Sequence, residues 1–142
     1  MLDLEVRSAQ VPRAFLDVTV RHSIPGDPER LAAAAAHAGA VNKEAEADKR
    51  RRYPDGRAPW RVVPLAFETY GRLGETTLRH LRLLARAQAA RLADADAEVA
   101  SQLLQRWGAR LSVALHRSNA ARLRSALGGA VPAAALAAEL AA

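Results

Sequence analysis

The chain of 142 residues contains no cysteine, one methionine and few aromatic residues, which make up 4% of it. Without cysteine it forms no disulfide and no cysteine-ligated zinc site of its own. No uninterrupted apolar run reaches the roughly 18 residues that a membrane-spanning helix needs. Met1 is followed by the acidic stretch Leu-Asp-Leu-Glu instead of the apolar core of a signal peptide. We therefore expect a soluble, intracellular protein with no membrane partner.

Lysine is also scarce, since Lys43 and Lys49 are the only two among 21 basic residues. The formal net charge is +6, and arginine supplies nearly all of the positive charge. This balance favours polyanionic partners, because the guanidinium group suits bidentate phosphate contacts. A GC-rich genome, in which arginine replaces lysine for no binding reason, explains the same composition. Composition alone leaves both interpretations open.

Common catalytic motifs are missing. The chain has no Walker loop, no G-x-G-x-x-G and no G-x-S-x-G. Its histidines do not show the H-x-x-x-H spacing of a metal site; they are His22, His37, His80 and His116. His22 follows a predicted strand and is either a solvent-facing loop residue or a neighbour of the site considered below.

The first half of the chain predicts an α/β arrangement. Residues 4–6 and 14–20 alternate in the period of two that is typical of strands, and they form a plausible hairpin. Asp27 and Pro28 are a good helix start, and we expect one helix over residues 28–52, weakened locally at Gly39. A third strand over residues 62–69 contains Pro64, which indicates either a sheet edge or an irregular start of the strand. Strand, helix and strand together predict a β-α-β unit.

The second half predicts helices. One amphipathic stripe runs through Leu78, Leu81, Ala85, Gln88 or Ala89, and Leu92, and a second runs through Val99, Leu103, Trp107, Leu111 and Leu115. Residues 94–96 either start the second helix or interrupt a continuous one. A short third helix is expected over residues 119–127, closed by two glycines. The stripe position of Trp107 predicts a core residue, and the alanine-rich tail after Pro132 has little to bury.

Asp17 is the most informative candidate for chemistry. It shares one strand face with Phe15 and Thr19, and an aspartate inside an apolar strand is costly to bury unpaired. It therefore caps a turn, pairs with an arginine or binds a metal. Lys49 lies on the helical stripe that includes Val41 and Ala45, so its amine is expected to emerge toward the sheet. The alternative is a lysine whose stem snorkels and whose charge meets the helix end.

The order Asp3, Asp17, Lys49, Tyr53 resembles the restriction-like endonuclease domain of site-specific non-LTR retrotransposons, a branch of the P-D…(D/E)-X-K nuclease superfamily. Leu2-Asp3-Leu4 stands where a P-D pair is expected, Asp17-Val18-Thr19-Val20 matches the second acidic strand, and Lys49 is the helical lysine ahead of an aromatic residue. Two positions depart from the pattern: Leu2 replaces proline, and the basic residue expected upstream would lie before Met1. The latter suggests a truncated gene product or a domain cut from a longer polypeptide.

The resemblance covers roughly residues 1–73 and implies a small restriction-endonuclease-like sheet with a crossing helix. It also implies a DNA endonuclease or nickase that uses Mg²⁺ or Mn²⁺ held by Asp3 and Asp17, with Lys49 assisting catalysis. Four residues would position the DNA: Arg50, Arg51, Arg52 and Tyr53. A reverse transcriptase or another domain of a parent polypeptide is the implied partner, and a eukaryotic element would place it in the nucleus.

We accordingly expect an α/β core over residues 1–73, a helical hairpin over residues 74–129 packed on it, and a tail over residues 130–142. Two alternatives to an active nuclease remain open. One is a catalytically inactive retroelement remnant that acts as a nucleic-acid-binding or helical interaction module. The other is an α-helical oligomerisation domain that binds no nucleic acid.

Overall fold

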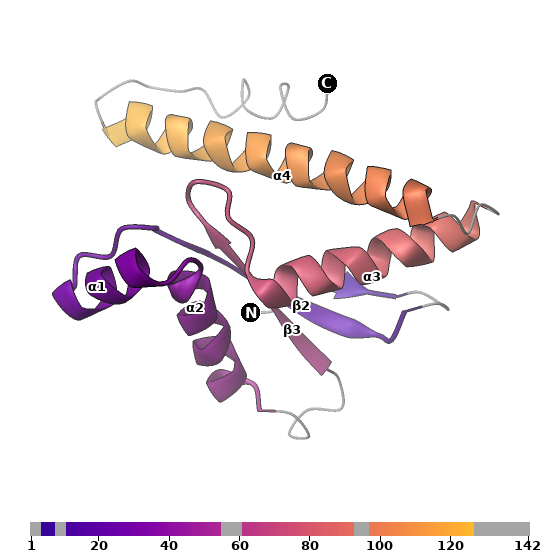
Figure 1. The fold of residues 1–142 in the computed structure, drawn as a ribbon, viewed down its shortest axis with the longest axis horizontal. Coiled ribbons are helices and arrows are strands. Elements are labelled where there is room, and N and C mark those ends of the chain that lie inside the picture. The colour runs from indigo at the N-terminus through magenta and orange to yellow at the C-terminus, as the bar shows by residue number, and fades with distance from the viewer. Residues whose placement is uncertain (1–3, 8–10, 55–60, 93–96, 127–142) are drawn as a thin grey trace.

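The computed structural model describes residues 4–7, 11–54, 61–92 and 97–126. In chain order their elements are β1 (Leu4–Val6), β2 (Ala14–Arg21), α1 (Pro28–Ala36), α2 (Ala40–Arg52), β3 (Arg61–Glu68), α3 (Glu75–Arg91) and α4 (Ala97–Ala126). α2 lies on one side of the sheet and α4 on the other, while α3 packs against β3 and α4 and meets α2 at its start (Figure 1). The mixed α/β class expected from the sequence is confirmed. The predicted tail over residues 130–142 lies outside the described residues.

The described strands form one sheet in the order β1-β2-β3. β1 pairs antiparallel with β2, with Leu4 opposite Leu16, and β3 runs parallel to β2, with Asp17 opposite Pro64. The predicted hairpin and β-α-β unit are therefore both present. Since β3 is the last strand of this order, Pro64 stands in an edge strand, where a missing N–H costs little.

The two faces of the sheet have different chemistry. The hydrophobic core lies on the face toward α4, where Leu111 and Leu115 pack on a cluster of strand residues: Ala14, Leu16, Val63, Leu65 and Phe67. The alternate residues of β2 project to the opposite face, where Asp17 meets Lys49 of α2. α2 buries two apolar residues, Val41 and Ala45, and two polar ones, Asn42 and Glu46. One side of the sheet is thus held by apolar burial and the other partly by polar contacts.

The expected single helix over residues 28–52 is wrong, because it is broken into α1 and α2. Asp27 caps α1 by accepting a hydrogen bond from the Arg30 backbone N–H, as the sequence predicted. Gly39 then adopts a left-handed conformation, with φ of 82°. A right-handed helix cannot continue through this conformation, which glycine adopts without a Cβ penalty. The break redirects the chain, so that α2 lies on the sheet while α1 buries no residue.

The helical half also differs from expectation at its end. The separate helix over residues 119–127 is wrong, since α4 runs without interruption from Ala97 to Ala126. Asn119 starts no helix; its side-chain amide donates a 2.6 Å hydrogen bond to the Thr69 carbonyl. Trp107 is only partly buried, and none of the α4 residues is fully buried. Leu92 lies beyond the end of α3 and is 56% exposed, so it does not belong to the buried stripe.

None of the helices in the described part of the chain is both long and apolar enough to cross a bilayer.

Candidate functional site

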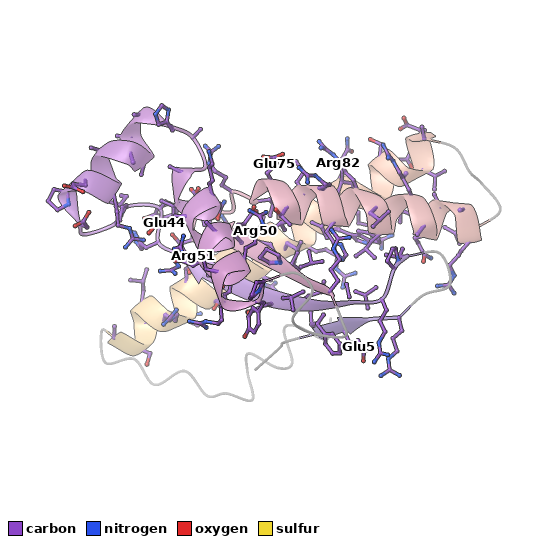
Figure 2. The ribbon with its side chains drawn as sticks, turned by 90° about the horizontal axis from the view of Figure 1, so that it is seen from below. Glu5, Glu44, Arg50, Arg51, Glu75 and Arg82 are labelled. Atoms are coloured by element: carbon purple, nitrogen blue, oxygen red, sulfur yellow. The ribbon has the colours of Figure 1, made fainter. Side chains whose placement is uncertain are left out.

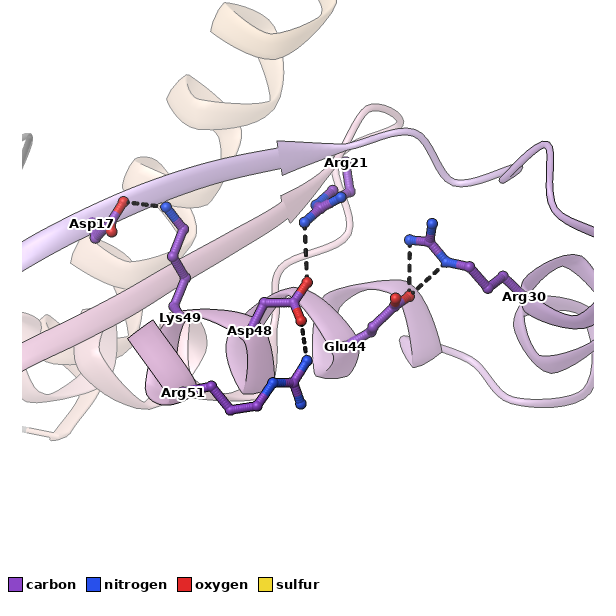
Figure 3. Close-up of polar contacts among 7 residues, drawn as sticks. All are labelled: Asp17, Arg21, Arg30, Glu44, Asp48, Lys49 and Arg51. Carbon is purple, nitrogen blue, oxygen red and sulfur yellow. Dashed lines mark hydrogen bonds and ion pairs between the residues drawn. The ribbon is translucent and has the colours of Figure 1, made fainter. Parts of the chain in front are cut away.

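The structure brings Asp17 and Lys49 together across the interface between β2 and α2. The Lys49 Nζ atom lies 2.7 Å from Asp17 Oδ1, although 32 residues separate the two in sequence (Figure 3). Asp17 is 3% exposed to solvent, and the Lys49 side chain is 18% exposed. The period of two in β2 turns Asp17 toward α2, and the helical stripe of Val41 and Ala45 turns Lys49 toward the sheet. Both placements follow the sequence prediction, and Asp17 pairs with this lysine in place of an arginine.

The second carboxylate oxygen of Asp17 is unusual. Oδ2 is buried and has no hydrogen-bond partner among the described residues. A buried acceptor without a partner is costly, so it marks a position where a further donor or a cation would be stabilising. An ionised carboxylate is also the ligand type that Mg²⁺ prefers. Asp17 therefore fits one ligand of the implied metal.

The other implied ligand, Asp3, lies outside the described residues. Among the described residues, no three side chains of His, Cys, Asp or Glu gather closely enough to hold a metal ion. Glu68 of β3, a further carboxylate of the sheet, pairs with Arg72 at 3.6 Å. Glu68 lies four residues after Pro64, which is the partner of Asp17 in the ladder. This separation along the strand is about 13 Å.

The basic run at the end of α2 divides into side chains with different surroundings. Arg51 pairs with Asp48, which also binds Arg21 at 3.2 Å (Figure 3). Arg52 is exposed at the end of the helix. Arg50 turns instead toward α3, where its Nη2 atom donates to the Thr76 hydroxyl at 2.7 Å. The run is therefore not one continuous phosphate-binding surface.

Glu46 organises the junction between α2 and α3. Its carboxylate is buried and accepts hydrogen bonds from the Thr76 backbone N–H at 3.0 Å and from the Thr76 hydroxyl at 2.6 Å. Arg50 supplies a third contact at 3.2 Å. Because the first N–H groups of a helix lack internal partners, Glu46 serves as a cap for α3 from outside it. Gly74, the residue before α3, permits this approach, since a Cβ there would overlap with Glu46.

An open cleft of about 200 Å³ lies beside the start of β3, between α2 and α3. The described residues that line it include four cations and no carboxylate: Lys49, Arg50, Tyr53, Arg61, Val62, Val63, Pro64, Thr76 and Arg79. Lys49 connects the cleft to Asp17, since its stem lines the cleft while its amine holds the carboxylate. Tyr53 caps the C-terminus of α2 and also lines the cleft.

Three contributors to this junction were missed by the sequence reasoning: Glu46, Arg61 and Arg79. Glu46 precedes Lys49 by three residues and therefore shares its helix face, a signal that could have found it. Arg61 and Arg79 are single arginines in a chain that has many of them. Nothing local in the sequence sets them apart, because their shared position depends on how β3 and α3 pack.

Two histidines have defined roles. His22 is exposed, and its Nδ1 atom forms hydrogen bonds with the backbone of Ile24, so it belongs to the loop after β2. His80 is buried on α3, and its Nε2 atom has no hydrogen-bond partner among the described residues. Burial, and next the positive charge of Arg61, lower the pKa of His80 below its usual value.

Comparison with known proteins gives no assignment, since no family model, curated protein or solved structure matches the chain.

Proposed function

We propose that the chain is a metal-dependent DNA endonuclease or nickase of the restriction-like, retroelement type. The observation that carries this proposal is the meeting of Asp17 and Lys49 at a buried position beside a cationic cleft. A carboxylate with a buried, unpartnered oxygen and an adjacent amine is what metal-assisted phosphodiester hydrolysis requires of the protein.

The arrangement of elements also supports the proposal. The resemblance implies an acidic residue on a strand and a lysine on the following helix, and Asp17 on β2 and Lys49 on α2 have these places. The lysine reaches the carboxylate without standing on the same strand. Thr19, two residues after Asp17, has the position where a lysine of the D-x-K pattern would otherwise stand.

The side chains have separable roles in this mechanism. Asp17, together with Asp3, would hold Mg²⁺ or Mn²⁺, and the ion when bound supplies Lewis-acid stabilisation of the phosphate charge. Lys49 provides a mobile cation with three donors, which can orient the attacking water or stabilise the charge that develops on phosphate. The burial of Asp17 keeps competing solvent away from its carboxylate and strengthens both interactions.

The test is nicking of supercoiled plasmid by the full chain, in Mg²⁺ or Mn²⁺ and in EDTA. We expect cleavage with the metal ions, none in EDTA, and a loss of several orders of magnitude in Asp17→Asn, because this change removes a metal ligand while keeping the shape of the side chain. Asp48→Asn is the matched control, since Asp48 is a carboxylate of α2 that pairs with the surface arginines Arg21 and Arg51. Cleavage that survives Asp17→Asn but not Asp48→Asn would contradict the proposal.

A second candidate function is nucleic-acid binding without catalysis, as expected of an inactive retroelement remnant. The observation that favours it is that the Lys49 amine already neutralises the Asp17 carboxylate. The nicking assay, combined with a measurement of DNA binding in EDTA, separates the two functions. Binding of DNA in EDTA, with no cleavage in either metal ion, would support the binding module and reject the nuclease.

A further inference from the structure

The cationic cleft draws side chains from three elements that are distant in sequence. α2 contributes Lys49 and Arg50, β3 contributes Arg61 at its first position, and α3 contributes Arg79 one turn after its start. The cleft is open to solvent and lies beside the first residues of β3. Four positive charges that converge on one small space repel each other unless an anion is present, so their arrangement calls for a negative partner.

The internal carboxylates offset only part of this charge. Lys49 is paired with Asp17, Arg50 with Glu46, and Arg79 with Glu75 at 2.7 Å. The last pair is almost fully exposed, at 74% and 85%, so Arg79 can exchange its partner at little cost.

Arg61 is the unbalanced cation of the cleft. No described carboxylate pairs with it, and its charge is felt by His80 on the neighbouring helix. Its guanidinium group offers five donors in a fixed geometry that matches the oxygens of phosphate. The cleft thus presents to a ligand one arginine that no described carboxylate pairs with, Arg61, and one exchangeable arginine, Arg79.

The size of the cleft restricts the class of ligand. Its volume of about 200 Å³ lies below the roughly 300–1,000 Å³ of pockets that enclose whole small molecules. A phosphate group with part of its sugar fits such a space, while the rest of a polymer would continue through the open side. A carboxylate peptide is less suitable, because a single carboxylate has fewer oxygens for the available donors.

We propose that this cleft binds one backbone phosphate of a nucleic-acid strand, held mainly by Arg61 and Arg79, with Tyr53 against the adjoining sugar or base. This inference rests on the proposed function, since it names the phosphate that lies next to the Asp17–Lys49 pair. It assigns a substrate-binding role to Arg61 and Arg79, which lie outside the basic run of α2. Lys49 is then shared, because it lines the cleft and contacts Asp17.

The inference is tested by fluorescence anisotropy of a labelled single-stranded oligonucleotide with the full chain in EDTA, where no cleavage occurs. The variants are Arg61→Gln and Arg79→Gln. The matched control is Arg82→Gln, an equal charge change at an exposed position of α3 that does not line the cleft (Figure 2). Circular dichroism verifies that each variant is folded, and the three sites are all at the surface.

We expect each cleft variant to bind roughly tenfold more weakly or worse, as for loss of a charge-assisted hydrogen bond. The slope of log affinity against log salt should fall by about 0.7 for each phosphate that the variant no longer neutralises. Inorganic phosphate should compete with the oligonucleotide for the wild-type chain at lower concentration than for Arg61→Gln. The control should keep the wild-type affinity within about twofold, since it removes a solvent-exposed charge that does not line the cleft.

Equal losses in the control and the cleft variants would overturn the inference, because general surface charge would then explain binding. Unchanged affinity in Arg61→Gln would overturn it as well. The proposed function is tested separately by plasmid nicking. Weaker binding by the cleft variants without any plasmid nicking would reject the nuclease and retain the phosphate site. Nicking that depends on Asp17, together with normal binding by the cleft variants, would support the nuclease and reject the phosphate site.

Discussion

Replacing Lys49 by methionine tests the Asp17–Lys49 pair most directly. Methionine keeps the length and the apolar stem of lysine but removes the amine that lies 2.7 Å from Asp17. The variant leaves an aspartate whose side chain is only 4% exposed without its counter-charge. We therefore expect the free energy of unfolding to fall sharply.

The size of this effect follows from burial and distance. Two unit charges at 2.7 Å attract by about 6 kcal/mol at an effective dielectric constant of about 20. Desolvation of both groups offsets part of that attraction. Breaking a buried pair by removing one partner typically costs about 3–5 kcal/mol, because the remaining charge is uncompensated. The reverse change, Asp17→Leu, should cost only about 1–3 kcal/mol, since Lys49 is partly exposed and its amine can reach solvent.

The double variant Asp17→Leu, Lys49→Met completes a thermodynamic cycle. It replaces an ion pair by apolar side chains of similar volume, a change that is often neutral or stabilising by about 1–4 kcal/mol. We expect its stability to be near or above that of the wild type, although it lacks both groups of the proposed catalytic site. A folded, stable and inactive double variant would show that the pair is retained for chemistry and not for stability.

Urea denaturation followed by circular dichroism measures all four members of the cycle. A midpoint that shifts without a change in slope reports a change in stability alone. A loss below about 0.5 kcal/mol in Lys49→Met, the range of an ordinary surface substitution, would refute the reasoning. The pair would then be a solvated contact, and the buried carboxylate of Asp17 would need another explanation.

Three further predictions concern the helices around the site. Gly74→Ala should destabilise the chain by about 1–3 kcal/mol in urea denaturation, because the new Cβ would overlap with Glu46 and lie 3.1 Å from the Ala66 carbonyl. Gly108→Ala is the control, since a Cβ there would have no atom within 4 Å, and it should be neutral or stabilising. Trp107→Ala should cost about 1–3 kcal/mol, less than the 3–5 of a fully buried aromatic residue, because Trp107 is partly buried; unchanged stability with loss of self-association in size-exclusion chromatography would make it a subunit contact. His80→Leu should flatten the pH dependence of stability below about pH 6.5. The pKa of His80 is lowered in the folded state, so the unfolded chain binds more protons than the folded one in that pH range. The free energy of unfolding of the wild type therefore rises with pH through this range and reaches a plateau above it. A pH profile of His80→Leu identical to that of the wild type, measured by urea midpoints, would contradict this last prediction.

The local elements followed from the sequence where a strong pattern or a capping residue was present. The alternation around Asp17 placed β2 and divided its faces correctly. Asp27 and Pro28 set the start of α1. The spacing of Val41, Ala45 and Lys49 predicted that the lysine is directed toward the sheet, and in the structure it meets Asp17 there. These features depend on neighbours within one or two turns of the chain, which a linear pattern contains.

Element ends and interruptions were harder to foresee. Gly39 looked like a local weakness within a helix, and its left-handed φ decided that the helix breaks there. Asn119 looked like a helix start, but α4 continues past it. Its side-chain amide donates a hydrogen bond to the carbonyl of Thr69, fifty positions earlier in the chain. In both cases long-range packing selected one of two conformations that the local sequence permits.

The sequence by itself predicted that Asp17 projects from one face of its strand and that Lys49 emerges toward the sheet, because side-chain direction follows from the periods of strand and helix. That the two side chains meet was decided by the packing of α2 on β2. Only the tertiary structure decided that Glu46 caps α3 and that Arg61 and Arg79 join Lys49 around one cleft. Those contacts depend on the positions of α2, β3 and α3 relative to one another. Such positions are fixed by burial of the shared core and by the close approach that Gly74 allows, and no spacing within a single element encodes them.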